Sequence, residues 1–173
     1  MLSDLLGMSA AVISPCGLFR YELRRIWDFG KPLLVVCMLN PSTADAEKND
    51  MTISTLIHFA TLWGYGGILV VNFCAFRTSK PKDMWKAKDP AGPDNHDYIR
   101  AALRYASENG GRALAAWGAV EHLDSVFMRE AEIWKVELIC LGLTKGGNPK
   151  HPAARGTHRI PRDQQPIVWR AFA

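Results

Sequence analysis

The fold of this chain is indicated by the apolar stretch Leu33-Leu-Val-Val-Cys-Met-Leu39 and by the polar residues Asn40-Pro41-Ser42-Thr43 that follow it directly. Seven consecutive apolar residues are typical of a strand at the centre of a parallel sheet, where both faces are covered. Pro41 ends the strand because proline has no N–H to donate and keeps the preceding residue out of the helical region. A buried strand that stops at polar residues indicates an α/β domain.

The alternation of strands and helices continues on both sides of this stretch. We predict further strands at residues 18–27, 68–75, 113–118 and 136–141, and helices at 52–63, 93–105 and 120–134. The strand at 18–27 partly alternates apolar and polar residues, as a half-exposed edge strand or hairpin arm does. Strands separated by helices favour right-handed crossovers. We therefore expect a three-layer α/β/α sandwich around a mostly parallel, four-stranded sheet, with an N-terminal edge strand or hairpin.

The bulk composition is that of an ordinary globular protein. The 173 residues, 48% hydrophobic and 22% charged, fit one domain over residues 1–173. We divide it into a lead-in (1–17), a core (18–155) and a basic C-terminal extension (156–173). The formal charge of +4 permits a polyanionic partner. No obligate protein partner is evident.

Membrane insertion and secretion are not expected. The longest apolar runs are far shorter than the roughly 20 residues that span a bilayer. The N-terminus lacks the basic start and long apolar centre of a secretory signal. We therefore expect a cytoplasmic protein with no membrane partner.

The sequence predicts no metal and no cofactor. The four cysteines form no C-x-x-C pair, and the histidines at 58, 96, 122, 151 and 158 form no close ligand pair. No P-loop and no G-x-G-x-x-G fingerprint follows a predicted strand, which disfavours triphosphate hydrolysis and dinucleotide-dependent redox chemistry. The absence of a G-x-S-x-G elbow disfavours a serine hydrolase of that type.

Polar residues gather where the predicted strands end. In sheets of this kind, ligands bind beyond the carboxyl ends of the strands. The candidate substrate-binding residues at this edge are Pro41, Ser42, Thr43, Asn72, Arg77, Trp117, Gly118, Thr144, Lys145, Lys150 and Pro152.

Four further residues are candidates for catalysis, and each has a structural alternative. Asn40 orients a water or a ligand carbonyl, or else it bonds its own turn. Asp45 and Asp50 activate water, or else they cap a helix, which we favour for Asp50. His151 donates to a developing oxyanion, or else it is an exposed loop histidine.

The binding residues also allow two interpretations. Ser42 and Thr43 either cap a helix or hold an anion. Arg77, Lys80, Lys145 and Lys150 either bind a phosphate-bearing ligand or form a solvated basic face. Trp117 either stacks on a base or packs in the core.

Several motifs in order resemble the bacterial and phage family called domain of unknown function 1643, over about residues 18–155. They are Leu39-Asn40-Pro-Ser-Thr-Ala-Asp45, Asn49-Asp50, Gly64-Tyr-Gly66, Asn72-Phe-Cys-Ala-Phe-Arg77, Ala116-Trp-Gly118, Leu141-Gly-Leu-Thr-Lys145 and Pro149-Lys-His-Pro152. Met51 stands where that family usually has proline.

Two of these motifs more distantly resemble the uracil-DNA glycosylase superfamily, its mismatch-specific type above all. The resemblance implies a fold of that kind and hydrolysis of an N-glycosidic bond in DNA. It also implies that Asn40 positions the attacking water and that His151 meets the base carbonyl and the DNA backbone. Met38 replaces a usual glycine and Ala153 a usual serine. The alternatives are a non-catalytic binder of nucleic acid or nucleotide, and an enzyme that acts on a free nucleotide or nucleoside.

Overall fold

The computed structural model describes residues 8–120 and 125–173. Within them, one mixed sheet has the strand order β1-β2-β4-β3-β5-β6-β7. The strands are β1 (Met8–Ile13), β2 (Arg20–Ile26), β3 (Leu33–Met38), β4 (Gly67–Asn72), β5 (Arg112–Ala115), β6 (Glu137–Cys140) and β7 (Ile167–Arg170). The predicted α/β class is confirmed.

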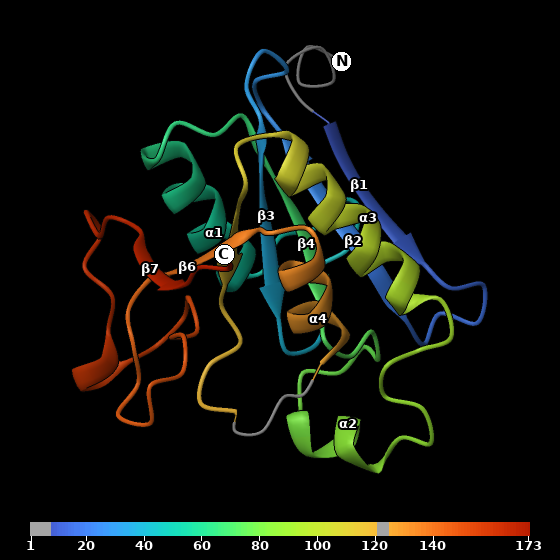
Figure 1. The fold of residues 1–173 in the computed structure, drawn as a ribbon. Coiled ribbons are helices and arrows are strands. Elements are labelled where there is room, and N and C mark those ends of the chain that lie inside the picture. The colour runs from blue at the N-terminus through green and yellow to red at the C-terminus, as the bar shows by residue number, and fades with distance from the viewer. Residues whose placement is uncertain (1–7, 121–124) are drawn as a thin grey trace.

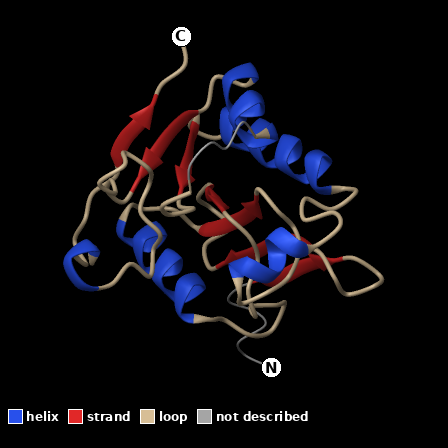
Figure 2. Cartoon of the chain, turned by 90° about the horizontal axis from the view of Figure 1, so that it is seen from below, coloured by secondary structure: helices blue, strands red, loops and turns tan. Residues whose placement is uncertain are grey.

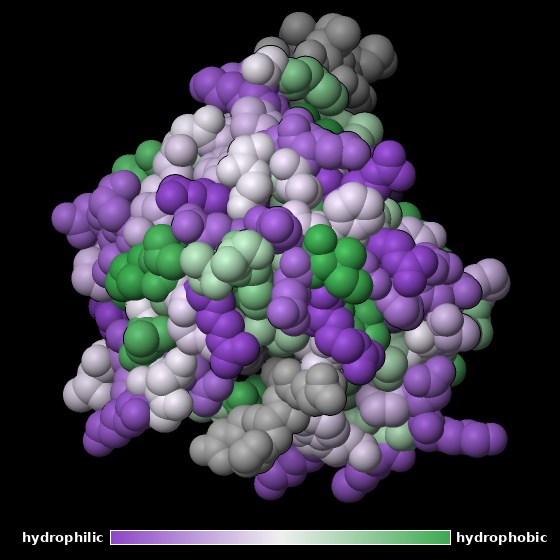
Figure 3. All heavy atoms as spheres, viewed as in Figure 1, coloured by the Kyte–Doolittle hydropathy of each residue, from purple (hydrophilic) through white to green (hydrophobic). Residues whose placement is uncertain are grey.

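Helices lie on both sides of this sheet, as Figure 2 shows. They are α1 (Met51–Leu62), α2 (Pro81–Lys86), α3 (Asn95–Glu108) and α4 (Val126–Ile133), with a short 3-10 turn, η2, at Gly156–His158. Figure 3 shows hydrophilic and hydrophobic residues interspersed on the face viewed in Figure 1. No helix in the described part of the chain is long and apolar enough to cross a membrane.

The prediction of a mostly parallel, four-stranded sheet is wrong, because the sheet is mixed and has seven strands. The four central strands, β4, β3, β5 and β6, run parallel to one another. The pairs β1–β2, β2–β4 and β6–β7 are antiparallel. Consequently β2 is not an edge strand, because β1 pairs with its outer side.

Side chains of the central strands alternate between two cores. Leu34 and Val36 pack in one cluster with Leu56 of α1. Val35 packs in the other cluster with Leu103 of α3. Because successive residues of a strand point to opposite faces, one apolar run supplies both cores, and α1 covers the face opposite α3 and α4.

The helix predictions differ from the structure mainly at the ends. Helix α1 begins after Asp50, whose Oδ1 accepts a hydrogen bond of 2.9 Å from the backbone N–H of Ile53. The predicted capping role of Asp50 is thereby confirmed. The predicted helix at 120–134 includes residues 121–124, which lie outside the described residues, and α4 spans Val126–Ile133. Helix α2 was not predicted, because six residues carry too short a periodic pattern.

Candidate functional site

A cavity of about 400 Å³ opens at the carboxyl ends of β5 and β6. It brings together five of the predicted site residues from three separate motifs. These are Gly118, Thr144, Lys145, Lys150 and His151. Ala154, Arg155 and His158 complete a further wall.

The loop after β6 turns back on itself and forms one side of the cavity. Leu143 and Pro149 form an isolated antiparallel bridge. The backbone N–H of Lys150 donates to the Gly142 carbonyl at 2.9 Å, and that of Gly118 donates to the Pro149 carbonyl at 3.0 Å. The ends of β5 and β6 are therefore joined by main-chain hydrogen bonds, which hold the cavity walls at a set distance.

Gly118 sits where a side chain would be unfavourable. Its φ of +84° lies in the left-handed region, which L-residues rarely adopt. An added Cβ would stand 3.5 Å from the Cβ of His151. Glycine at this position lets the backbone turn sharply beside His151.

Trp117 precedes this glycine but points into the core. Only 4% of its surface is exposed, and its ring packs against Phe73 and Trp169 at centroid distances of 4.7 and 5.2 Å. Of the two interpretations of Trp117, packing in the core therefore describes its position. A base could not stack on this ring without repacking the core. The indole N–H of Trp169 in turn donates to the Gly147 carbonyl at 3.1 Å, which fastens β7 to the cavity loop.

The imidazole of His151 has a defined orientation and tautomer. Its Nδ1 accepts a hydrogen bond of 3.1 Å from the backbone N–H of Ala153. A neutral imidazole whose Nδ1 accepts carries its proton on Nε2, so the ring has one donor left. Burial lowers the pKa of His151, and the carboxylate of Asp50 opposes this effect only in part. His151 is thus a neutral hydrogen-bond donor at neutral pH.

The rest of the cavity wall is cationic. Lys145, Lys150 and Arg155 line it, and no carboxylate does among the described lining residues. The ion pairs found in the described chain involve none of these three side chains. A site with unpaired cations and no fixed anion favours a negatively charged ligand.

A second hollow, which we call the α1 groove, adjoins the cavity. It has a volume of about 650 Å³ and lies between one face of α1 and the segment 152–162. Pro152, another predicted site residue, lines it with Met51, Arg159 and Arg162. Two residues, Ala154 and Arg155, line both hollows, which makes the two contiguous.

Asn40 is held by the chain itself. Its Nδ2 donates to the carbonyl of Thr78 at 2.8 Å and to that of Pro41 at 3.0 Å. Since both neighbours are acceptors, the amide orientation is determined, and Oδ1 is the group left to meet a ligand. Pro41 is buried, Ser42 is half-buried and Thr43 is exposed. The loop lies at the carboxyl end of β3 but does not line the cavity.

Asp45 also supports this loop. Its Oδ1 accepts hydrogen bonds from the backbone N–H groups of Glu47 at 2.9 Å and Lys48 at 2.8 Å. These bonds lower the pKa of Asp45. The carboxylate is therefore a local cap in this structure, and it lines neither hollow.

Two arginines of β2, which sequence reasoning missed, anchor the same loop. Arg20 is 3% exposed and donates from Nη1 to the Ala44 carbonyl at 2.7 Å. Burial lowers its pKa to about 10 despite the opposing charge of Asp50. Arg25 donates from Nε to Oδ1 of Asn49 at 2.8 Å. In the sequence these two arginines appear only as charged residues of a partly apolar strand. The sequence alone cannot tell whether such a charge is buried or faces solvent.

Asn72 and Arg77 lie away from both hollows. Asn72 is 1% exposed, and neither polar atom of its side chain has a partner among the described residues. Arg77 donates to the Gly17 carbonyl at 3.2 Å. The structure therefore separates these two residues from the cavity to which the sequence assigned them.

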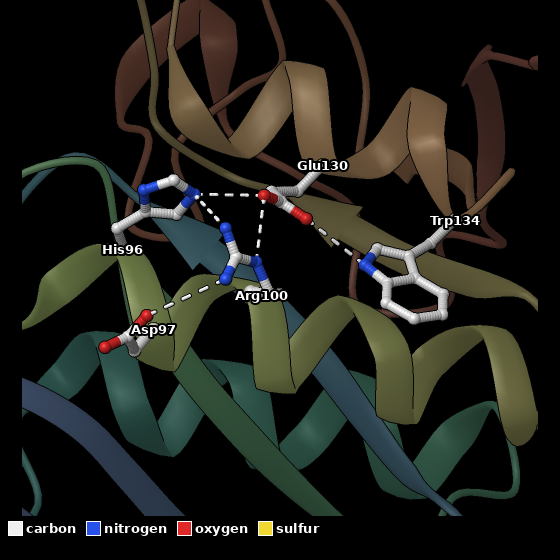
Figure 4. A network of polar contacts seen from close by, with 5 residues as sticks. All are labelled: His96, Asp97, Arg100, Glu130 and Trp134. Atoms are coloured by element: carbon white, nitrogen blue, oxygen red, sulfur yellow. Dashed lines mark hydrogen bonds and ion pairs between the residues drawn. The ribbon is translucent and has the colours of Figure 1, made fainter.

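A second cluster of titratable side chains joins α3 to α4 (Figure 4). Glu130 is 6% exposed. Its carboxylate accepts from His96 at 3.0 Å, Arg100 at 3.3 Å and Trp134 at 3.2 Å. Burial opposes its ionisation, but these donors outweigh burial and lower the pKa of Glu130. Both oxygens of the Glu130 carboxylate have hydrogen-bond donors, and none of these residues lines either hollow. We therefore interpret the cluster as a structural junction between α3 and α4.

The described residues contain no group of three or more side chains suited to a metal ion. The family model described as "Protein of unknown function (DUF1643)" matches residues 20–153, which confirms the predicted family resemblance. Neither the curated proteins nor the solved structures yielded a match. The likeness to the glycosylase fold accordingly stays a prediction.

Proposed function

Because the chain belongs to the DUF1643 family, whose description assigns no activity, we propose from the cavity alone that it binds a phosphate-bearing nucleotide. The observation that carries this proposal is the lining of the cavity. Lys145, Lys150 and Arg155 supply cations, and no described lining residue supplies a carboxylate.

The shape of the cavity supports a ligand of this size. Its volume of about 400 Å³ lies within the range of roughly 300–1,000 Å³ typical of small-molecule sites. Lysines attract a phosphate as point charges, and the Nε2–H of His151 adds a directed donor. Gly146 has no side chain to cover its backbone, so its backbone groups can bond the base or sugar.

Calorimetric titration with purine and pyrimidine monophosphates tests this proposal. We expect binding by the wild-type protein, and an affinity about tenfold lower for each of Lys145→Gln and Lys150→Gln, because each removes a charged contact of about 1.4 kcal/mol. Arg104→Gln, on exposed α3 surface, is the control and should bind normally. Absence of binding, or full affinity in the double variant Lys145→Gln/Lys150→Gln, would refute the proposal.

A second candidate function is hydrolysis of an N-glycosidic bond. The feature in its favour is the carboxylate of Asp50, whose charge raises the pKa of His151 against the larger effect of burial. In this reaction water attacks C1′ of the sugar while the C1′–N bond breaks. Asp50 takes the proton of the water, and His151 Nε2–H bonds the oxygen of the departing base, which leaves with the bonding electron pair. The glycosylase resemblance assigns the orientation of that water to Oδ1 of Asn40, although Asn40 lines neither hollow.

Base release from nucleotides, and abasic-site formation in oligonucleotides that carry uracil, hypoxanthine or a hypermodified base, tests this second candidate. Asp50→Asn should abolish product while it keeps the helix cap, since asparagine caps as well as aspartate does. Asn40→Ala should also lower the rate. Equal rates in the wild-type protein and Asp50→Asn would exclude it.

A further inference from the structure

We infer that the ligand is a single-stranded polynucleotide whose chain continues from the cavity along the α1 groove, an inference that rests on the proposed nucleotide binding. The two hollows share the wall formed by Ala154 and Arg155. If the phosphate of a nucleotide in the cavity contacts Arg155, the next nucleotide of the chain can therefore enter the α1 groove.

The lining of the α1 groove suits the backbone of such a chain. Arg155, Arg159 and Arg162 stand on one side. Ser54, on the facing side of α1, carries a hydroxyl that can donate to a phosphate or sugar oxygen. Met51 also lines the groove, is 66% exposed and offers an apolar surface to a base.

One histidine of the groove is engaged within the protein. Nε2 of His58 lies 2.7 Å from the Arg162 carbonyl, and Nδ1 lies 3.2 Å from Nη2 of Arg162. Because Nδ1 faces a guanidinium donor, the Nε2 atom carries the proton and donates to the carbonyl. His58 thus holds the arginine backbone against α1 and keeps the guanidinium over the groove.

The distribution of charge along the chain favours a ligand longer than a mononucleotide. Residues 142–173 hold six of the 21 basic residues but only one of the 17 acidic ones. The preceding 141 residues hold 15 basic and 16 acidic residues. The whole positive net charge therefore lies in the segment that walls the two hollows, and Arg159 and Arg162 line the groove but not the cavity.

Concave hollows favour an unpaired strand over a duplex. Unpaired bases are free to leave the stack and enter a cavity, whereas paired bases must first be extruded. The recognised chemistry, a chain of phosphodiesters with exposed bases, is shared by DNA and RNA. The experiment therefore includes one arm for each.

Fluorescence anisotropy with oligodeoxythymidylate and oligouridylate of about ten nucleotides, a length within the usual single-strand site size, tests the inference. We expect the oligonucleotide to bind at least tenfold more tightly than the monophosphate. Its log K should fall with log salt by about 0.7 per phosphate neutralised. Arg159→Gln/Arg162→Gln should reduce that slope by about 1.4 and leave monophosphate affinity unchanged.

Arg104→Gln/Lys135→Gln is the matched control, because it removes two exposed positive charges from α3 and from the end of α4. It should keep the wild-type slope. Arg159→Gln alone, with a slope lower by about 0.7, guards against misfolding of the double variant. Monophosphate binding without tighter oligonucleotide binding, or an unchanged slope in Arg159→Gln/Arg162→Gln, would overturn the inference and leave the proposed function standing. Failure to bind either ligand would instead overturn the proposed function.

Discussion

The Nδ1 atom of His151 accepts a hydrogen bond of 3.1 Å from the backbone N–H of Ala153. This hydrogen bond determines both the tautomer and the position of the imidazole. It leaves Nε2–H as the free donor of the ring and ties the imidazole to the segment that separates the cavity from the α1 groove. The protonation state of one side chain is thereby linked to the geometry of both hollows.

The first prediction concerns stability at mildly acidic pH. Burial lowers the pKa of His151 in the folded protein, while the unfolded chain titrates near the ordinary value of about 6.5. Below that pH the unfolded state binds the extra proton first, so folding stability falls as pH falls through about 6.5. His151→Gln removes this term. We expect its melting temperature to fall less between pH 7.5 and about pH 5.5 than that of the wild-type protein.

Thermal unfolding at a series of pH values measures this effect. His158→Gln is the control, because His158 is exposed at the rim of the same cavity. It should show the wild-type pH dependence. A wild-type pH dependence in His151→Gln would show that the imidazole contributes nothing to acid sensitivity.

The second prediction separates the two roles of Asp50, as cap of α1 and as neighbour of His151. Asp50→Ala should lower the free energy of unfolding by about 1 kcal/mol, because it leaves the N–H of Ile53 without its acceptor. Asp50→Asn keeps the acceptor and should change stability by only a few tenths of a kcal/mol.

Both variants should lower the pKa of His151 further, because the carboxylate that opposes the lowering is gone. Denaturant unfolding measures the first effect, and a titration of the imidazole by NMR measures the second. An unchanged pKa of His151 in Asp50→Asn would show that the two groups do not interact.

The third prediction compares two buried asparagines. Asn72 has no side-chain partner among the described residues, so Asn72→Leu loses no hydrogen bond and should raise stability by about 1 kcal/mol. Asn95 donates to the carbonyls of Asn72 at 3.0 Å and Phe73 at 3.1 Å. Asn95→Leu should therefore lower stability by about 2–3 kcal/mol.

Chemical denaturation of both variants decides this. Since Asn72 lines neither hollow, Asn72→Leu should also keep the monophosphate affinity of the wild-type protein. A marked destabilisation by Asn72→Leu would contradict the prediction and point to a bound water as its partner.

The fourth prediction concerns the junction of α3 and α4 in Figure 4. Glu130→Gln removes the charge that His96 and Arg100 share, and should lower the free energy of unfolding at pH 7 by about 1–2 kcal/mol. This figure is modest because about half of the Arg100 side-chain surface meets solvent, which screens its charge.

The pH dependence of this loss follows from the pKa of Glu130, which lies below its ordinary value. The contribution is present above about pH 4.3, the ordinary glutamate value, and disappears as pH falls through the folded-state pKa. The wild-type and Glu130→Gln curves should therefore converge in acid. Glu108→Gln, in an exposed pair with Arg104, should change stability by less than about 0.5 kcal/mol.

The apolar runs determined the central part of the fold. Leu33-Leu-Val-Val-Cys-Met-Leu39 contains β3 and supplies both cores, because a strand turns alternate side chains to opposite faces. The outer strands were not visible in the same way. Strands β1 and β7 lie in the segments predicted to be a lead-in and an extension, because they form by pairing with a neighbour rather than by their own pattern.

The candidate site, too, was predicted in part from the sequence and decided in part by the tertiary structure. The sequence by itself determined that polar and basic residues collect at the carboxyl ends of the strands, because chain order and crossover handedness place those ends on one edge. Only the tertiary structure decided which of them face a shared hollow. It brought Gly118, Lys145 and His151 to one cavity, and it turned Trp117 into the core. That choice depends on side-chain direction and on hydrogen bonds between distant segments, neither of which is local to the sequence.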